Sequence, residues 1–293
     1  MSKLPLVSII IPTYNEGRNL KKTIDSIEKM TTYPYYEIIV VDDGSTDGSI
    51  KKIKDKHVKI VKTKRLGAPR ARNAGAKKAK GDILVFCDSH VFPKHKKWID
   101  EIVGFHEKNK HVGVVAPVIS VLGKERAKGF GLRFKNSTLE TQWNNRLSKK
   151  PFETPLFCAC CFSIKKDVFF KVGMFNQDFF YWWYDDYDLA LRCWLAGFPI
   201  YVLPHIECSH IFKTKWKHCP DLTKTDENLL LMALLYFNED RVERVLRALH
   251  KTRDIIGPLD NVVKNGVFDK RDRFNKIRKF DDEWYFRKFK MKI

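Results

Sequence analysis

Residues 6–16 read Leu-Val-Ser-Ile-Ile-Ile-Pro-Thr-Tyr-Asn-Glu, an apolar run that ends in polar side chains. The same change recurs in residues 37–43, Glu-Ile-Ile-Val-Val-Asp-Asp, and in residues 82–90, Asp-Ile-Leu-Val-Phe-Cys-Asp-Ser-His. Short runs rich in Ile and Val are typical of strands that are buried on both faces of a sheet. We therefore predict three buried strands, each followed by a polar cluster.

The segments between these strands carry helix signals. Leu20, Ile24 and Ile27 repeat at the spacing of one helix face, and Pro69 suits the first turn of an Ala-rich helix. Together with another strand expected at 57–61, this alternation predicts an α/β fold with a mostly parallel central sheet flanked by helices. Ligands of such sheets bind beyond the carboxyl ends of the strands, so we expect the polar clusters to form one site.

The rest of the chain divides less clearly. Residues 122–150 are rich in Gly and Lys, which favours a long surface segment. From about residue 226 the pattern becomes helical, with an apolar stripe formed by Val242, Val245, Leu246 and Leu249. We expect an α/β domain over 1–220 and a basic helical extension over 221–293.

Composition indicates a folded protein with anionic partners. The chain has 293 residues, 44% of them hydrophobic, and a formal net charge of +20. No apolar run approaches the roughly 20 residues that span a bilayer, and the first residues leave no room for a secretory signal. A cytoplasmic location is expected.

The segment 241–293 carries 16 Lys and Arg against 8 Asp and Glu and ends in an aromatic, basic stretch. One interpretation is peripheral contact with the anionic inner face of a membrane. Packing over the active site and a homodimer contact are the alternatives.

Asp88 and His90 stand two residues apart at a predicted strand end, so their side chains project to the same side. A carboxylate and a neutral imidazole suit Mn²⁺ or another first-row metal, whereas Mg²⁺ prefers oxygen ligands. We predict a divalent cation here, Mn²⁺ favoured and Mg²⁺ the alternative. Cys158 and Cys161 also form a C-x-x-C pair, but the apolar sequence around them favours core packing over zinc.

Four ordered segments, 7–16, 38–47, 70–75 and 81–90, resemble family 2 glycosyltransferases of the GT-A fold. Two later segments, 161–175 and 205–213, are similar to polypeptide GalNAc-transferases. The resemblance implies transfer of a sugar from a nucleotide-diphosphate donor, UDP favoured. The acceptor is left open among a glycan, a lipid, a peptide and a small molecule.

The resemblance also implies roles for individual residues. His210 would complete the metal site with Asp88 and His90. Binding of the nucleotide-sugar would fall to Pro12, Tyr14, Glu16, Asp43, Arg72 and Asp88.

Residues 182–188 read Trp-Trp-Tyr-Asp-Asp-Tyr-Asp, where family 2 enzymes have an acidic motif. Asp186 is the candidate base that deprotonates the acceptor, with Asp185 as its neighbour, and Trp182 and Trp183 would contact the acceptor. The sequence has D-x-H where family 2 usually has D-x-D, and Trp-Tyr-Asp-Asp where GalNAc-transferases have Trp-Gly-Gly-Glu. We favour an inverting reaction, with a retaining GalNAc-transferase-like reaction as the alternative.

Two other function classes explain less of the sequence. A basic nucleic-acid-binding protein would account for the charge, but the spacing of common DNA- and RNA-binding motifs is missing, so we do not expect nucleic acid as a partner. A nucleotidyltransferase would usually place a Gly-rich phosphate loop after the first strand. Residues 12–17, Pro-Thr-Tyr-Asn-Glu-Gly, are not such a loop.

Overall fold

The computed structural model describes residues 4–53, 55, 57–144, 148–179, 184–213 and 222–293. Within them the strands are β1 (Val7–Thr13), β2 (Tyr36–Asp42), β3 (Val58–Lys62), β4 (Ile83–Cys87), β5 (Val91–Pro93), β6 (Val114–Val121), β7 (Lys124–Gly129), β8 (Leu132–Phe134), β9 (Thr141–Trp143), β10 (Phe152–Glu153), β11 (Cys161–Lys165) and β12 (Ile200–His210). The helices are α1 (Arg18–Met30), the 3₁₀ helix η1 (Ile50–Lys52), α2 (Ala68–Lys78), α3 (Trp98–Lys108), α4 (Lys166–Lys171), α5 (Asp185–Leu195), α6 (Leu222–Tyr236), α7 (Glu239–His250), α8 (Ile256–Lys264), α9 (Val267–Asn275) and α10 (Asp282–Lys288).

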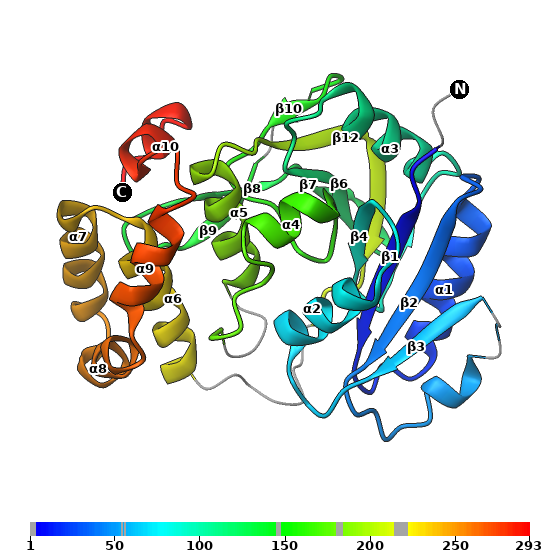
Figure 1. Cartoon of the computed structure of the whole chain (residues 1–293), viewed down its shortest axis with the longest axis horizontal. Coiled ribbons are helices and arrows are strands. Elements are labelled where there is room, and N and C mark those ends of the chain that lie inside the picture. Colours follow the sequence, from blue (N-terminus) through cyan, green and yellow to red (C-terminus); the bar gives the residue numbers. More distant parts are fainter. Residues whose placement is uncertain (1–3, 54, 56, 145–147, 180–183, 214–221) are drawn as a thin grey trace.

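Ten of the described strands form one large sheet with helices on both faces, and β8 and β9 form a separate two-stranded sheet (Figure 1). Its main path has the order β10-β12-β6-β11-β4-β1-β2-β3, and β5 and β7 pair with β12 and β6. β1 is parallel to β2 and β4, β2 to β3, and β6 to β12, while β11 runs antiparallel between β4 and β6. The prediction of a mostly parallel α/β sheet is confirmed.

Side-chain alternation along the strands builds two cores. On β1, Ile9 and Ile11 face the core covered by α1 and α3, whereas Ile10 faces the core covered by α2, α4 and α5. All three side chains are fully buried. The absence of a polar face explains why these strands read as continuous apolar runs.

The C-terminal helices α6 to α10 share the second core with the sheet. A buried contact reinforces this packing, because Asp188 on α5 pairs with Arg192 and accepts a 2.6 Å hydrogen bond from the Tyr236 hydroxyl on α6. The helical extension predicted after residue 221 is present, and the boundary at 220 itself stays a prediction.

The expectation of a long surface segment at residues 122–150 is corrected by the structure. Residues 122–150 contain β7, β8 and β9, and Leu139 is fully buried, so much of this segment is not a surface loop. Its strands are three to six residues long, too short for a clear alternation of polar and apolar residues. On the far side of β6, β12 runs from Ile200 to His210 across an irregularity between Leu203 and Glu207.

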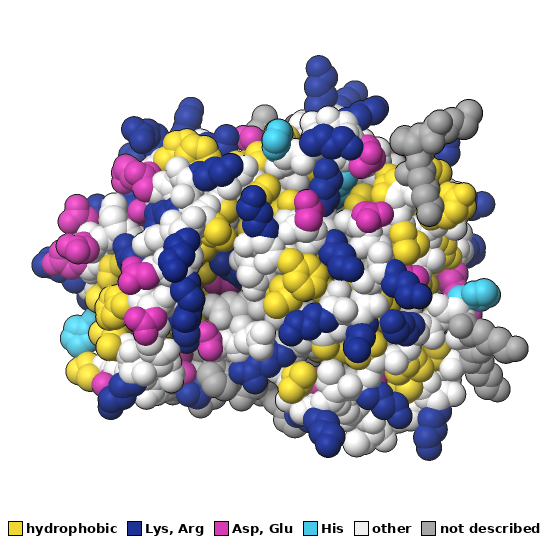
Figure 2. Space-filling view, viewed as in Figure 1, with side chains coloured by type: hydrophobic (Ala, Val, Ile, Leu, Met, Phe, Trp, Pro, Cys, Tyr) yellow, Lys and Arg dark blue, Asp and Glu magenta, His cyan; other side chains and the backbone are white. Residues whose placement is uncertain are grey.

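Positive charge is not confined to the C-terminal helices. Residues 51–80 contain 13 Lys and Arg and only one acidic residue, Asp55. Figure 2 shows Lys and Arg predominating on the face that carries α2 and β3, whereas acidic and basic side chains mix over the C-terminal helices. Across the part of the chain that the structure describes, no helix combines the length and apolarity needed to cross a membrane.

Candidate active site

The loops after β1 and β2 are joined by side-chain hydrogen bonds. Asn15, at a positive φ of 52°, accepts hydrogen bonds through Oδ1 from the backbone N–H groups of Thr46 (2.7 Å) and Asp47 (3.3 Å). The Asp47 carboxylate in turn accepts a 2.7 Å bond from the N–H of Gly17. The polar residues that follow the first two strands therefore hold each other in place.

Asp43 is fully engaged with the protein. Oδ1 accepts hydrogen bonds from the Thr63 hydroxyl (2.6 Å) and the Leu66 N–H (2.7 Å), and Oδ2 accepts one from the Gly67 N–H (2.8 Å). These bonds shape the loop that leads into α2. Asp42 accepts a 2.8 Å bond from the Ser45 N–H, as expected of a residue that forms a turn. The nucleotide contact predicted for Asp43 stays a prediction.

Pro12 and Tyr14 lie at the same edge of the sheet. Pro12 is buried on β1, and Tyr14 follows the strand with a half-buried side chain. The Arg65 guanidinium carbon lies 3.8 Å from the centre of the Tyr14 ring, a cation–π contact. Sequence reasoning did not identify Arg65, because the contact depends on how two separate loops meet.

Backbone pairing brings Asp88, His90 and His210 together. Asp88 follows β4, and β5 begins directly after His90 and pairs with β12 so that Val91 lies opposite His210. The N–H of Ile211 also donates a 3.2 Å hydrogen bond to the carbonyl of His90. One ligand atom from each of Asp88, His90 and His210 lies within 4.8 Å of the other two.

Several polar atoms in this cluster are buried without a hydrogen-bond partner. Among the described residues, none forms a hydrogen bond with either ring nitrogen of His210, and Nδ1 of His90 has only the Glu16 carboxylate beside it, at 3.3 Å. Buried polar atoms are normally paired, so the two unpaired ring nitrogens of His210 beside the Asp88 carboxylate fit a site completed by a cation. The residues predicted to bind metal therefore have the position and the chemistry that a divalent ion requires.

Glu16 belongs to this cluster. Its Oε2 lies 3.3 Å from Nδ1 of His90, and Lys213 pairs with its Oε1. Burial opposes ionisation, but His90 and Lys213 outweigh it and lower the pKa of Glu16. Lys213 was not predicted as a functional residue, although it ends the segment that resembles GalNAc-transferases.

Arg72 on α2 connects the metal cluster to α5. Its buried guanidinium donates to Asp88 at 2.8 Å and to Asp185 at 2.7 Å. Burial raises the pKa of Asp88, but Arg72, His210 and His90 together outweigh burial and hold this pKa well below its usual range. Asp88 is therefore an ionised carboxylate whose orientation is fixed by Arg72.

Asp185 and Asp186 have different surroundings. Asp185 is 1% exposed and bound to Arg72, and burial raises its pKa well above the usual value. Asp186 is half-buried, accepts a 3.1 Å bond from the Ala159 N–H and has a pKa raised to about 6, mainly by burial. Of the two, Asp186 is the more accessible and has the pKa suited to a base near neutral pH.

Of the remaining residues of interest, the structure describes His205 and Cys161. Trp182 and Trp183 lie outside the described residues. His205 lies apart from the metal cluster and pairs with Glu101 at 2.9 Å, consistent with a structural role. Cys161 is fully buried, with its sulfur 3.6 Å from that of Cys87, as expected for core packing.

The curated relatives of this chain include GalNAc-transferases and an inactive homologue. This chain is 29% identical to "Inactive polypeptide N-acetylgalactosaminyltransferase-like protein 5" of Macaca fascicularis, over 84% of this chain and 60% of the relative. Identity to polypeptide N-acetylgalactosaminyltransferase 14 of Homo sapiens is 31%, over 72% of this chain and 42% of the relative. The chain thus spans less than two thirds of the length of these relatives.

Solved structures share the fold. GalNAc-T7, crystallised with UDP, GalNAc and Mn²⁺, has a TM-score of 0.78 at 20% identity, covering 98% of this chain and 57% of GalNAc-T7. The mannosyltransferase PcManGT from Pyrobaculum calidifontis, in complex with GDP-Man and Mn²⁺, has a TM-score of 0.57 at 18% identity, covering 91% and 70%. The GT-A fold is therefore present.

The family model for glycosyl transferase family 2 matches residues 8–173. This region contains the loops after β1 and β2, Arg72, and the Asp88 and His90 pair. The match covers more than half of the chain and includes two of its three candidate metal ligands. The chain belongs to glycosyl transferase family 2.

Proposed function

We propose that this protein is a metal-dependent glycosyltransferase that moves a sugar from a UDP-sugar to an acceptor hydroxyl. The observation that carries the proposal is the cluster of Asp88, His90 and His210, which presents unpartnered imidazole nitrogens beside an ionised carboxylate. It lies at the edge of the sheet where the polar loops after β1 and β2 also meet. In this family 2 chain, the candidate metal ligands and the polar loops that would bind the nucleotide therefore lie at the same edge of the sheet.

Relatives and structural neighbours support the donor and the metal. The neighbour GalNAc-T7 was crystallised with UDP, GalNAc and Mn²⁺, so UDP-GalNAc and Mn²⁺ are the first donor and cation to test. In this chain Asp88, His90 and His210 would hold the ion. When bound, the ion supplies positive charge that stabilises the negative charge developing on the departing diphosphate.

For the chemical step, we assign the base to Asp186. Asp185 is tied to Arg72, which leaves Asp186 as the carboxylate that can accept a proton from an acceptor hydroxyl. Arg72 fixes Asp88 and Asp185 together, and Glu16 with Lys213 fixes His90. A carboxylate that accepts the proton of the acceptor hydroxyl fits an inverting displacement. A retaining outcome is the alternative.

The test measures nucleotide release from UDP-GalNAc, UDP-GlcNAc, UDP-glucose and GDP-mannose with Mn²⁺, with and without EDTA. We expect release from one UDP-sugar, abolished by EDTA and by His90→Ala. Calorimetry with UDP and Mn²⁺ separates donor binding from catalysis. A folded protein that binds no nucleotide would contradict the proposal, whereas binding without turnover on a broad acceptor panel would assign it to the inactive members of the family.

NMR of the first-formed product then decides the stereochemistry. Inversion at the anomeric carbon supports Asp186 as a base. Retention would remove that role and favour a reaction like that of the GalNAc-transferase alternative.

A further inference from the structure

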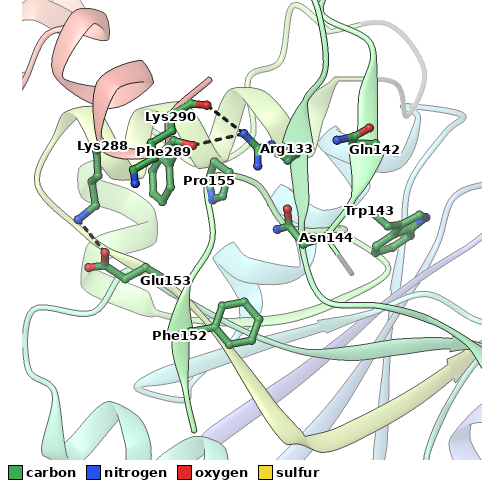
Figure 3. A pocket seen from close by; sticks show the side chains of 10 residues that line it. All are labelled: Arg133, Gln142, Trp143, Asn144, Phe152, Glu153, Pro155, Lys288, Phe289 and Lys290. Atoms are coloured by element: carbon green, nitrogen blue, oxygen red, sulfur yellow. Dashed lines mark hydrogen bonds and ion pairs between the residues drawn. The ribbon is translucent and has the colours of Figure 1, made fainter. Parts of the chain in front are cut away.

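A cavity of about 720 Å³ lies outside the metal cluster, between the β8–β9 hairpin, β10 and the C-terminal end of α10. Figure 3 shows the hairpin residues on one side and Lys288, Phe289 and Lys290 on the other. None of the candidate donor, metal or catalytic residues lines it. Its volume is within the range of small-molecule sites.

The lining combines aromatic rings with side chains that form hydrogen bonds. Trp143, Phe152 and Phe289 supply apolar surface, and Gln142 and Asn144 supply amides. The C–H faces of sugar rings pack on aromatic side chains, while their hydroxyls require amides and charged groups as partners. Gln142 is exposed, which leaves its amide accessible from solvent. This mixture is the chemistry of a carbohydrate site.

The cavity also carries positive charge. Glu153 pairs with Lys288 at 2.6 Å, which neutralises that cation. Arg133 donates to the carbonyl oxygens of Phe289 (3.4 Å) and Lys290 (3.2 Å), which leaves its charge uncompensated. Among the described residues, no carboxylate forms an ion pair with Arg133 or Lys290. Two cations at one rim favour a ligand that bears an acidic group.

Aromatic contacts connect the cavity to the metal cluster. The Trp143 ring centre lies 6.4 Å from that of Phe212, which lies 4.4 Å from that of His210. Trp143 is seated directly against Gly129, where an added Cβ would come within 1.9 Å of the ring. A short oligosaccharide that ends at the reaction centre could therefore extend past Phe212 into the cavity.

We propose that this cavity binds an outer part of the acceptor, and that the acceptor is an oligosaccharide bearing a carboxylate or phosphate group. The inference rests on the proposed function, because it places the cavity on the acceptor side of a glycosyltransferase. Trp143 would stack on a sugar ring, Gln142 would bind hydroxyls, and Arg133 with Lys290 would bind the acidic group.

The experiment uses the full chain on an array of neutral, uronate-containing and phosphorylated oligosaccharides, with poly-glutamate as a competitor. We expect acidic oligosaccharides to bind best. Comparing the uronate-containing with the phosphorylated oligosaccharides shows which acidic group the cavity binds. Gln142→Ala and Lys290→Glu change exposed side chains, and each is expected to weaken binding roughly tenfold. Lys78→Glu, an equal charge change on the exposed face of α2, is the control and should leave binding unchanged.

Thermal unfolding of each variant confirms folding, and Trp143→Ala is interpreted only if it unfolds like the wild type. Absence of oligosaccharide binding, equal binding of neutral sugars, equal competition by poly-glutamate, or insensitivity to Gln142→Ala and Lys290→Glu would each overturn the inference. UDP binding by the wild type is measured separately. If the wild type does not bind UDP, the proposed function is contradicted. If it binds UDP but no oligosaccharide, only the acceptor assignment is contradicted.

Discussion

The two sides of the candidate donor site differ in how their polar atoms are satisfied. On the loop side, Asn15 and Asp43 accept hydrogen bonds from backbone groups of neighbouring loops. On the cluster side, neither ring nitrogen of His210 has a hydrogen-bond partner among the described residues. The polar atoms of the loop side have their hydrogen-bond partners before a ligand binds, whereas those of the cluster side require a ligand as a partner. Substitutions on the loop side should therefore cost stability, and those on the cluster side should cost activity.

The largest effect is expected for Asp186→Asn. Loss of a base lowers the rate of sugar transfer about 10³-fold. The pKa of Asp186 is raised to about 6 in the folded protein, so folding favours the protonated side chain. The stability that this gives the folded state is fully present below about pH 4 and is lost as the pH rises through 6. Asn is neutral at all pH values, so the variant should unfold at a higher temperature than the wild type at pH 8. Transfer kinetics and thermal unfolding at pH 8 test both effects, and undiminished transfer would exclude Asp186 as the base.

His210→Ala should lower activity by more than about 100-fold with Mn²⁺ present. No hydrogen bond to its ring is lost, so the melting temperature should change little. His205→Ala, on the same strand but paired with Glu101, is the control and should keep its activity. If both variants lose activity equally, the effect comes from β12 and not from metal binding.

Asp43→Ala tests whether the loop side of the site contributes to stability. It leaves the Thr63 hydroxyl and the N–H groups of Leu66 and Gly67 without their acceptor, so we expect a loss of roughly 3 kcal/mol in the free energy of unfolding. Urea denaturation measures it, with exposed Asp25→Ala on α1 as the control for charge. Unchanged stability together with weaker UDP binding would instead assign Asp43 to the nucleotide, as the family resemblance implies.

The smallest effect is the pH dependence. A base with a pKa of about 6 is mostly ionised at pH 7.5 and about one quarter ionised at pH 5.5, so activity should fall about fourfold between them. Metal binding requires neutral imidazole, so loss of the metal at low pH acts in the same direction. A rate profile at saturating Mn²⁺ separates the two, and a flat profile down to pH 5 would count against both.

Much of the fold and the metal pair could be predicted because the signals are local. Apolar runs ending in polar clusters located β1, β2 and β4, and a strand end places Asp88 and His90 on the same side. The choice of Asp186 over Asp185 and the prediction of His210 came from family resemblance. The structure then placed His210 beside the pair through the pairing of β5 with β12.

Other features depend on contacts that no local pattern contains. Arg72 and Asp185 are 113 residues apart, and only the folded structure brings their side chains within hydrogen-bond distance. β11 enters the sheet antiparallel between two parallel strands, which its five residues do not reveal. The cavity beside Trp143 joins a hairpin to the last residues of the chain, and no sequence motif marked it.

The irregularity in β12 has a consequence for insertions and deletions. Between Leu203 and Glu207 the register against β6 already shifts, so this stretch can absorb a change in length. From Glu207 to His210 the pairing with β6 is continuous, and from Cys208 to His210 the strand also pairs with β5. One added residue there would turn His210 to the opposite face of the sheet. Length variation among functional homologues should therefore collect at residues 204–206 and be absent from 207–210.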